Sequence, residues 1–260
     1  MKHIPVTFWA IVAAIFGLIL GSFLNVVIYR IPNNLSLAKP RSFCPNCKTP
    51  IKAYDNIPII SWFILRGSCR NCKSSISFQY PLVELSTGAL FFTIVYFIKP
   101  ISVTPAICVL AAAIVSTSVI DLKYMKLPTK ILYPTLILGG ILLAVASYQT
   151  HDFKRMLTAL IVGLIAAALL FLFFMILPPG SIGLGDVRLI AIQSFFLGWF
   201  GWKFAILGFA LGIVVGGFLT LGLLAFGVKK MKDKIPFGPF LSIGALASAY
   251  MTLAFPVWVK

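Results

Sequence analysis

Long apolar segments recur along most of this chain and restrict its fold more than any other feature. A helix needs ~20 mostly apolar residues to cross the hydrocarbon layer of a membrane, and most of these segments approach that length. We expect membrane-spanning helices at residues 8–29, 82–98, 105–121, 131–148, 156–177, 187–201, 202–226 and 236–258. Only the turn at 198–203 separates the sixth segment from the seventh, so the expected number is about eight. The sequence therefore predicts an all-α polytopic membrane protein.

One sizeable polar segment, residues 32–80, separates the first apolar segment from the second, and we call it the lid. Its aromatic residues and prolines indicate a folded domain that lies against the membrane rather than a flexible linker. We therefore divide the chain into a first transmembrane helix (1–31), a small cytoplasmic domain (32–80) and a helical transmembrane core (81–260).

The formal net charge of +16 could suggest nucleic-acid binding, but the distribution of the basic residues argues against it. If the lid is cytoplasmic, sixteen of the 22 lysines and arginines lie on the cytoplasmic side and six lie outside. That asymmetry is typical of the loops of polytopic membrane proteins. We therefore expect a lipid environment and no nucleic-acid partner.

Four of the five cysteines form two CxxC pairs within the lid, Cys44 with Cys47 and Cys69 with Cys72. Four thiolates in two such pairs are typical of a tetrahedral structural zinc site. Disulfides or redox-active CxxC units are the alternative. A cytoplasmic location argues against disulfides, and the surrounding sequence lacks the βαβ pattern of a thioredoxin. The pattern predicts one structural zinc ion bound by these four cysteines.

Two of the six acidic residues lie at the edges of apolar segments. Asp121 ends the run ICVLAAAIVSTSVI, and Asp186 follows two glycines in GLGD. Carboxylates are costly there and are therefore candidates for function, although Asp186 could cap a helix and Asp121 could turn into water. The expected topology places both on the cytoplasmic face, whereas His3 and His151 fall on the other side. Paired carboxylates are therefore the best candidates for chemistry on the cytoplasmic face.

Three charged residues in or beside the lid have more than one interpretation. Asp55 and Glu84 could bind a cationic or hydroxylated ligand, and each could equally be a solvated charge or an ion-pair partner. Arg30 ends the first apolar segment, and we expect its side chain to extend along the helix into the membrane–water interface.

Several segments together resemble the type IV prepilin peptidases. They are, in chain order, GSFLNVVIYRIP, the two CxxC pairs with NIPIISW and LRGSC between them, YPLVEL, IDLKYMKLP, GLGDVRL and IPFGPFL. The resemblance covers nearly the whole chain, and the combination is specific, whereas GxGD alone would be a weak signal.

The resemblance implies a bifunctional, multi-pass enzyme of the bacterial inner membrane with its active site facing the cytoplasm. Such an enzyme cleaves the leader peptide of type IV prepilins or type II secretion pseudopilins and then methylates the new amino terminus with S-adenosylmethionine. It implies that Asp121 and Asp186 are the catalytic aspartates and that the four paired cysteines bind zinc.

The resemblance associates methyl transfer with the cysteine-bearing domain, where we select three candidate cofactor-binding residues. Asp55 and Glu84 could attract the positively charged methyl donor, and Gly67 could allow a close backbone approach.

Two alternatives from other functional classes stay open. A membrane aspartyl protease of the preflagellin-peptidase type would cleave without methylating. A non-enzymatic zinc-knuckle membrane protein or a transporter would use the intramembrane acids differently, and transport would favour carboxylates nearer the middle of the membrane.

Overall fold

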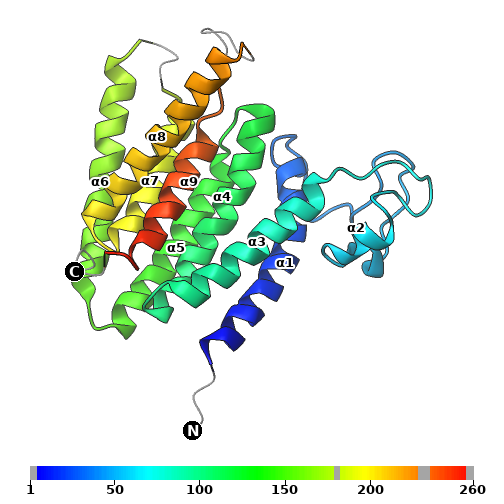
Figure 1. Ribbon diagram of the computed structural model, residues 1–260, viewed down its shortest axis with the longest axis horizontal. Coiled ribbons are helices and arrows are strands. Elements are labelled where there is room, and N and C mark those ends of the chain that lie inside the picture. The colour runs from blue at the N-terminus through cyan, green and yellow to red at the C-terminus, as the bar shows by residue number, and fades with distance from the viewer. Residues whose placement is uncertain (1–4, 179–181, 228–234, 256–260) are drawn as a thin grey trace. The chain divides into compact units, whose positions relative to one another are not determined.

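The computed structural model describes residues 5–178, 182–227 and 235–255, and this part of the chain is nearly all helical (Figure 1). Its elements are α1 (Val6–Arg30), η1 (Ala53–Asn56), α2 (Ile60–Ile64), α3 (Gln79–Phe97), η2 (Ile101–Val103), α4 (Thr104–Tyr124), α5 (Thr129–Gln149), α6 (Phe153–Ile176), α7 (Leu184–Gly198), α8 (Trp202–Ala225) and α9 (Gly238–Met251). The described residues contain two isolated β-bridges and no strand.

Each of the eight predicted apolar segments overlaps one helix, which confirms the prediction of an all-α polytopic membrane protein. Within the described residues, six helices are long and apolar enough to cross a membrane, namely α1, α3, α4 with the preceding η2, α5, α6 and α8. The other two, α7 and α9, have 15 and 14 residues and are shorter than a usual span. The last predicted segment extends to residue 258 and so ends outside the described residues.

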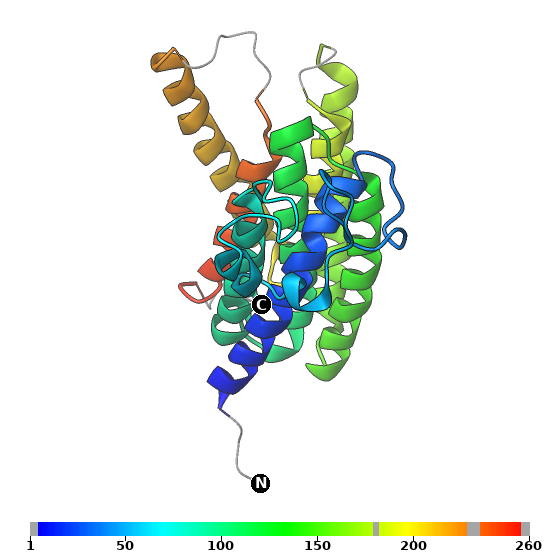
Figure 2. The same ribbon diagram turned by 90° about the vertical axis from the view of Figure 1, so that its right-hand side faces the viewer.

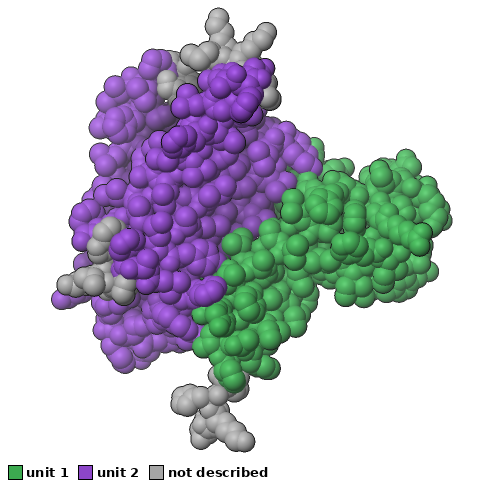
Figure 3. Space-filling model, viewed as in Figure 1, with its two compact units in different colours: residues 1–96 green, residues 97–260 purple. Residues whose placement is uncertain are grey.

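The helices pack into two compact units, residues 1–96 and residues 97–260 (Figure 3). This division places α3, except its last residue, with α1 and the lid. The functional division at 31/32 and 80/81 stays a prediction.

In the first unit, α1 and α3 approach closely at glycines. A β-carbon placed on Gly17 would lie 2.9 Å from the Cα atom of Gly88, and one placed on Gly21 would lie 2.7 Å from the Cα atom of Glu84. Small residues at such crossings let helix backbones approach closely in lipid. The lid leaves α1 at Arg30 and returns at Gln79, so both its ends are tied to this helix pair.

The second unit contains α4 to α9, which run along roughly one common direction (Figures 1 and 2). Its core is rich in large aromatic side chains, and Phe196, Trp199, Phe200 and Phe204 are almost completely buried. In the most apolar 18-residue stretch of each helix, 72% of the residues are buried in η2–α4 but only 11% in α6. The helix α4 also contacts α5, α7 and α9 within this unit.

Candidate active site and candidate metal centre

Asp121 lies in the last turn of α4 and is only 6% exposed. The helix ends three residues later because Met125 adopts the left-handed conformation, with its N–H donating to the Asp121 carbonyl at 2.8 Å. The side chain therefore points back into the unit instead of into water. Its Oδ2 accepts a hydrogen bond of 3.0 Å from the backbone N–H of Gly238, the first residue of α9. Such first-turn N–H groups have no partner within their own helix.

Asp186 is half-buried and is the third residue of α7. Its carboxylate folds back over Gly183, the residue before the helix, and forms a hydrogen bond with the Gly183 backbone. A β-carbon on Gly183 would lie 2.7 Å from the Asp186 Oδ2 atom, so the glycine makes this position possible. The N-cap of α7 is thus Gly183 rather than Asp186. Asp186 lies in the first turn, and its side chain bonds back to the backbone of the N-cap residue.

The second unit brings the two carboxylates into one site. The side chain of Leu127, in the loop after α4, packs against the starts of both α7 and α9. A β-carbon on Gly185 would lie 3.0 Å from the Leu127 Cβ, and one on Gly238 would lie 3.3 Å from the Leu127 Cδ2. The charges of Asp121 and Asp186 are close enough to interact electrostatically. Two carboxyl groups so placed can share a proton.

Gly238 and Leu127 were not identified from the sequence as parts of this site. Pro239 signals the start of a helix, because proline is favoured in the first turn. That signal marks where α9 begins, but it does not indicate that its first N–H faces a carboxylate 117 residues earlier in the chain.

The second candidate site is the cysteine cluster of the lid. The Sγ atoms of Cys44, Cys47, Cys69 and Cys72 all lie within 4.8 Å of one another. The Sγ atoms of Cys44 and Cys72 are 3.8 Å apart, and a tetrahedral zinc ion with Zn–S bonds of about 2.3 Å requires a separation of about 3.8 Å. All four are free thiols in the described structure. The donor set and its spacing therefore fit a metal such as zinc.

The two CxxC pairs form matching hairpins that are offset by 25 residues. In the first, the Lys48 N–H donates to the Cys44 carbonyl at 2.9 Å; in the second, the Lys73 N–H donates to the Cys69 carbonyl at 3.0 Å. Both lysines have a φ of 59°. The two isolated β-bridges, Phe43 with Pro50 and Ser68 with Ser75, also occupy equivalent positions.

The hairpins also contact each other equivalently. The Asn46 amide lies 3.8 Å from the Cys72 Sγ, and the Asn71 amide lies 3.8 Å from the Cys47 Sγ. Hydrogen bonds from the side chain and backbone of Ser74 lower the pKa of the Cys72 thiol to about 6. Since the thiolate is the metal-binding form, these contacts favour metal binding near neutral pH.

A cavity of about 690 Å³ lies within the first unit and is lined by residues of the lid, α1 and α3. Its volume is typical of a small-molecule site. Asp55 and Glu84, two of the three candidate cofactor-binding residues, line this cavity, but Gly67 does not. Gly67 has a φ of +63°, and a β-carbon there would lie 2.9 Å from the indole ring of Trp62. The close approach at this glycine is therefore to Trp62, which itself lines the cavity.

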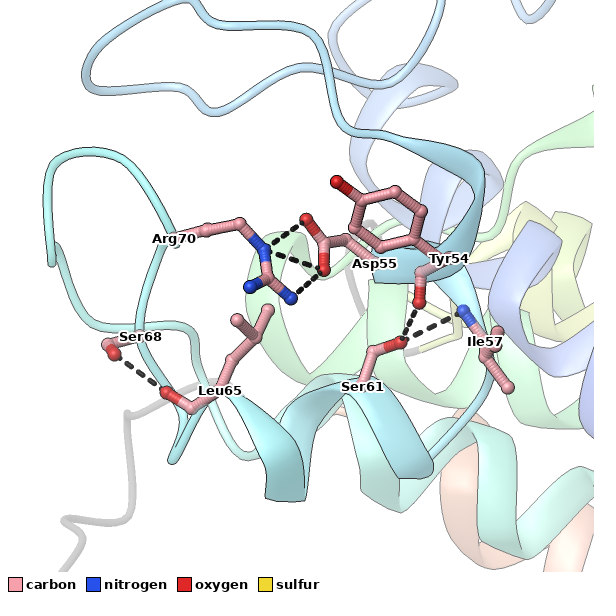
Figure 4. Close-up of polar contacts among 7 residues, drawn as sticks. All are labelled: Tyr54, Asp55, Ile57, Ser61, Leu65, Ser68 and Arg70. Carbon is pink, nitrogen blue, oxygen red and sulfur yellow. Dashed lines mark hydrogen bonds and ion pairs between the residues drawn. The ribbon is translucent and has the colours of Figure 1, made fainter.

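Asp55 is the ion-pair partner of Arg70. The Arg70 guanidinium donates hydrogen bonds of 2.6 and 2.9 Å to the two oxygens of the carboxylate, and Figure 4 shows the two side chains pointing toward each other. The hydrogen bonds from Arg70 hold the pKa of Asp55 below its usual value. Nearby, the Ser61 hydroxyl donates to the Tyr54 carbonyl at 2.9 Å and accepts from the Ile57 N–H at 3.1 Å (Figure 4). These bonds connect the 3₁₀ turn η1 to α2 and to the second hairpin.

Glu84 is only 6% exposed and lies on α3 beside the crossing with α1. Its Oε2 accepts a hydrogen bond of 2.7 Å from the backbone N–H of Ile59 in the lid. Glu84 therefore makes a direct polar contact between α3 and the lid.

The expectation that Arg30 extends into the interface is wrong. Its side chain is buried, with 6% exposure, and donates hydrogen bonds to the carbonyl oxygens of Ser36, Leu37 and Pro40. Arg30 therefore holds the first loop of the lid against the end of α1. This role could not be predicted from residue types, because the acceptors are backbone atoms.

Comparison with known proteins identifies the family of this chain. The model of the bacterial peptidase A24 N-terminal domain matches residues 15–98, and that of the type IV leader peptidase family matches residues 108–227. A prepilin leader peptidase/N-methyltransferase of Aeromonas hydrophila is 34% identical over 88% of this chain and 86% of its own. A type 4 prepilin-like proteins leader peptide-processing enzyme of Escherichia coli O78:H11 is 34% identical over 94% of this chain and 95% of its own. No solved structure matches the chain significantly. The chain therefore belongs to the type IV leader peptidase family.

Proposed function

We propose that this chain cleaves the leader peptide of type IV prepilins or type II secretion pseudopilins and then methylates the newly exposed amino terminus. The names of its relatives combine these two activities, and the similarity extends over most of both chains. The observation that carries the proposal is the convergence of Asp121 and Asp186 at the ends of α4 and α7, beside the first N–H of α9.

Asp121 and Asp186 are the proposed catalytic residues for cleavage. Two adjacent carboxyl groups cannot both ionise cheaply, so one holds a proton while the other is charged. The charged member takes a proton from water as the water oxygen attacks the peptide carbonyl carbon, while the protonated member donates to the carbonyl oxygen. The leaving amine then receives a proton from the pair as the C–N bond breaks. The two acids act as one unit, so their parts in the reaction are not assigned separately.

Cys44, Cys47, Cys69 and Cys72 are the proposed zinc ligands. A bound zinc ion would supply a structural cross-link between the two hairpins rather than a reactive centre, because four protein ligands leave no open position. The matching hairpins and the 3.8 Å separation between the Cys44 and Cys72 sulfurs support this assignment.

The proposed binding site for the methyl donor, S-adenosylmethionine, is the cavity of the first unit. Tyr29, Trp62 and Tyr80 line it beside Glu84, and aromatic rings together with a carboxylate attract a positively charged sulfonium group. Asp55 also lines the cavity, but its carboxylate is already engaged by Arg70. Gly67 contributes indirectly, since it allows the packing of Trp62.

We also propose that both sites face the cytoplasm of a bacterial inner membrane. The six candidate spans support a multi-pass arrangement. The excess of lysine and arginine in the lid and in the loops that share its side supports the orientation.

The test is a single reaction containing the purified full chain, a prepilin and S-adenosylmethionine, with the products resolved by mass. We expect the wild type to release the leader and add one methyl group to the remaining protein. Asp121→Asn and Asp186→Asn should each abolish cleavage while the protein still inserts in the membrane. Normal cleavage by either variant removes that residue from the catalytic assignment. Cleavage by the wild type without methylation supports the preflagellin-peptidase type instead.

A further inference from the structure

The short helix α2, which is part of the lid, has an apolar face on the outer surface of the lid. Ile60, Phe63 and Ile64 are 55%, 63% and 69% exposed, and their spacing of three and four residues places them on one side of a helix. The intervening residues face inward: Ser61 is buried, and the Trp62 indole N–H donates to the Ile76 carbonyl at 3.1 Å. The outward face of α2 is therefore apolar, while Ser61 and Trp62 face the interior of the lid, where both line the cavity.

The apolar surface continues beyond α2 toward the membrane-spanning helices. Phe78 is 60% exposed and contacts the Trp62 ring edge-on, with centroids 5.6 Å apart. It directly precedes Gln79, the first residue of α3. We call Ile60, Phe63, Ile64 and Phe78 the α2 patch. Exposed apolar clusters of this kind mark surfaces that bind a protein or a membrane.

The charge of the lid favours an anionic partner. Its 49 residues, 32–80, contain seven lysines and arginines and one acid, Asp55, which gives a formal charge of 7 − 1 = +6 before any metal site is counted. The Asp55 carboxylate is itself bound to Arg70. Basic segments next to a membrane are attracted to anionic lipid headgroups.

The α2 patch lies beside the helix pair that would anchor the lid. The lid is tied to α1 at one end and to α3 at the other, and both helices are candidate membrane spans. In Figure 1, α2 lies below the level at which α1 ends and α3 begins, to the side of this helix pair. A bilayer crossed by α1 and α3 would therefore lie within reach of the patch.

We propose that the α2 patch inserts into the boundary between headgroups and acyl chains of an anionic lipid bilayer. The lid is then a membrane-attached domain, held by apolar insertion together with attraction of its basic residues to the lipid. Its position is set by the membrane surface as well as by its connections to α1 and α3.

The first experiment places the photoreactive residue p-benzoylphenylalanine at position 63 of the full chain in phosphatidylglycerol nanodiscs. We expect illumination to attach lipid to the peptide that contains position 63, as measured by mass spectrometry. The matched control carries the same residue at position 37, because Leu37 is an exposed apolar side chain of the lid outside the patch (40% exposed). Attachment to residues 97–260 or to a second copy of the chain, or equal lipid labelling at both positions, overturns the proposal.

The second experiment tests the contribution of lipid charge by hydrogen–deuterium exchange of the peptides that cover residues 57–66. We expect severalfold slower exchange in phosphatidylglycerol than in phosphatidylcholine nanodiscs, with the difference declining as salt is raised from ~0.05 to ~0.5 M. Phe63→Ser combined with Ile64→Ser should abolish the difference while peptides from α1 and α3 exchange as in the wild type. Equal exchange of the wild type in the two lipids contradicts the proposal.

Discussion

The backbone N–H of Ile59 donates a 2.7 Å hydrogen bond to the buried carboxylate of Glu84, which fastens the lid to α3. Ile59 has φ 61° and ψ −54°, a conformation that is unfavourable for a β-branched residue. The Ile60 N–H also bonds back to the Pro58 carbonyl at 2.5 Å, so the chain turns sharply at this residue. The contact thus holds a strained turn at the wall of the cavity.

Replacing Glu84 should loosen this part of the lid. Glu84→Ala removes the acceptor of a partly buried N–H, and the loss of such a hydrogen bond costs about 1 kcal/mol. We expect faster hydrogen exchange over residues 53–66 and a larger loss of methylation than of leader cleavage. Glu84→Gln keeps an acceptor oxygen, so it should restore the exchange protection without restoring the charge. If Glu84→Gln also restores methylation, Glu84 acts by positioning the lid and not by attracting the methyl donor.

Small side chains at two glycines should displace the proposed catalytic acids. A β-carbon at Gly183 would collide with Asp186, and one at Gly238 would lie 2.8 Å from the Asp121 Oδ2. Because a shift of ~1 Å in a reacting group can cost about 100-fold in rate, Gly183→Ala and Gly238→Ala should each strongly reduce kcat for cleavage. Gly217→Ala is the matched control, since no atom lies within 4 Å of its added carbon. Unchanged cleavage by both variants would contradict the prediction that the positions of Asp186 and Asp121 limit the rate.

The purified protein should contain one zinc ion per chain. Cys44→Ser and Cys72→Ser each remove a thiolate, so we expect loss of the metal and faster hydrogen exchange throughout both hairpins. Cys108→Ser is the control, because this buried cysteine belongs to α4 rather than to the cluster. Elemental analysis of carefully prepared wild type checks the metal. Absence of zinc together with intact CxxC disulfides would contradict the assignment.

The ion pair between Asp55 and Arg70 allows two roles of Asp55 to be separated. The pair is partly exposed, with 52% of the arginine side chain accessible, so its loss should have little effect on stability. If Asp55 only holds Arg70, then Asp55→Asn and Arg70→Gln should impair methylation equally. If Asp55 contacts the methyl donor, Asp55→Asn should raise the KM for S-adenosylmethionine more than Arg70→Gln does. The measurement is the methylation rate as a function of donor concentration.

The helices and the cysteine cluster could be predicted because each depends on signals local in sequence. Apolar segments indicated the positions of α1 and α3 to α9, and the two CxxC pairs indicated the cluster. The contacts of Arg30 and Gly238 could not be predicted, because each joins a residue to backbone atoms whose positions depend on packing. The predicted segment 187–201 already had the 15 residues of α7, but hydropathy did not reveal that α9 ends at Met251, since buried helices and membrane spans are equally apolar.

The two cysteine hairpins bring together the ends of the chain segment between them. Cys44 follows the end of α1 and Cys72 precedes the start of α3, and their sulfurs meet although the residues are 28 positions apart. The intervening segment, which carries η1, α2 and Ile59, is thus a loop joined at its base. A metal bound at that base would fix the distance between the two ends of the loop and so reduce the number of conformations open to it. The chain between the hairpins is thus held at two places, at the cysteine cluster and at the hydrogen bond from Ile59 to Glu84 on α3.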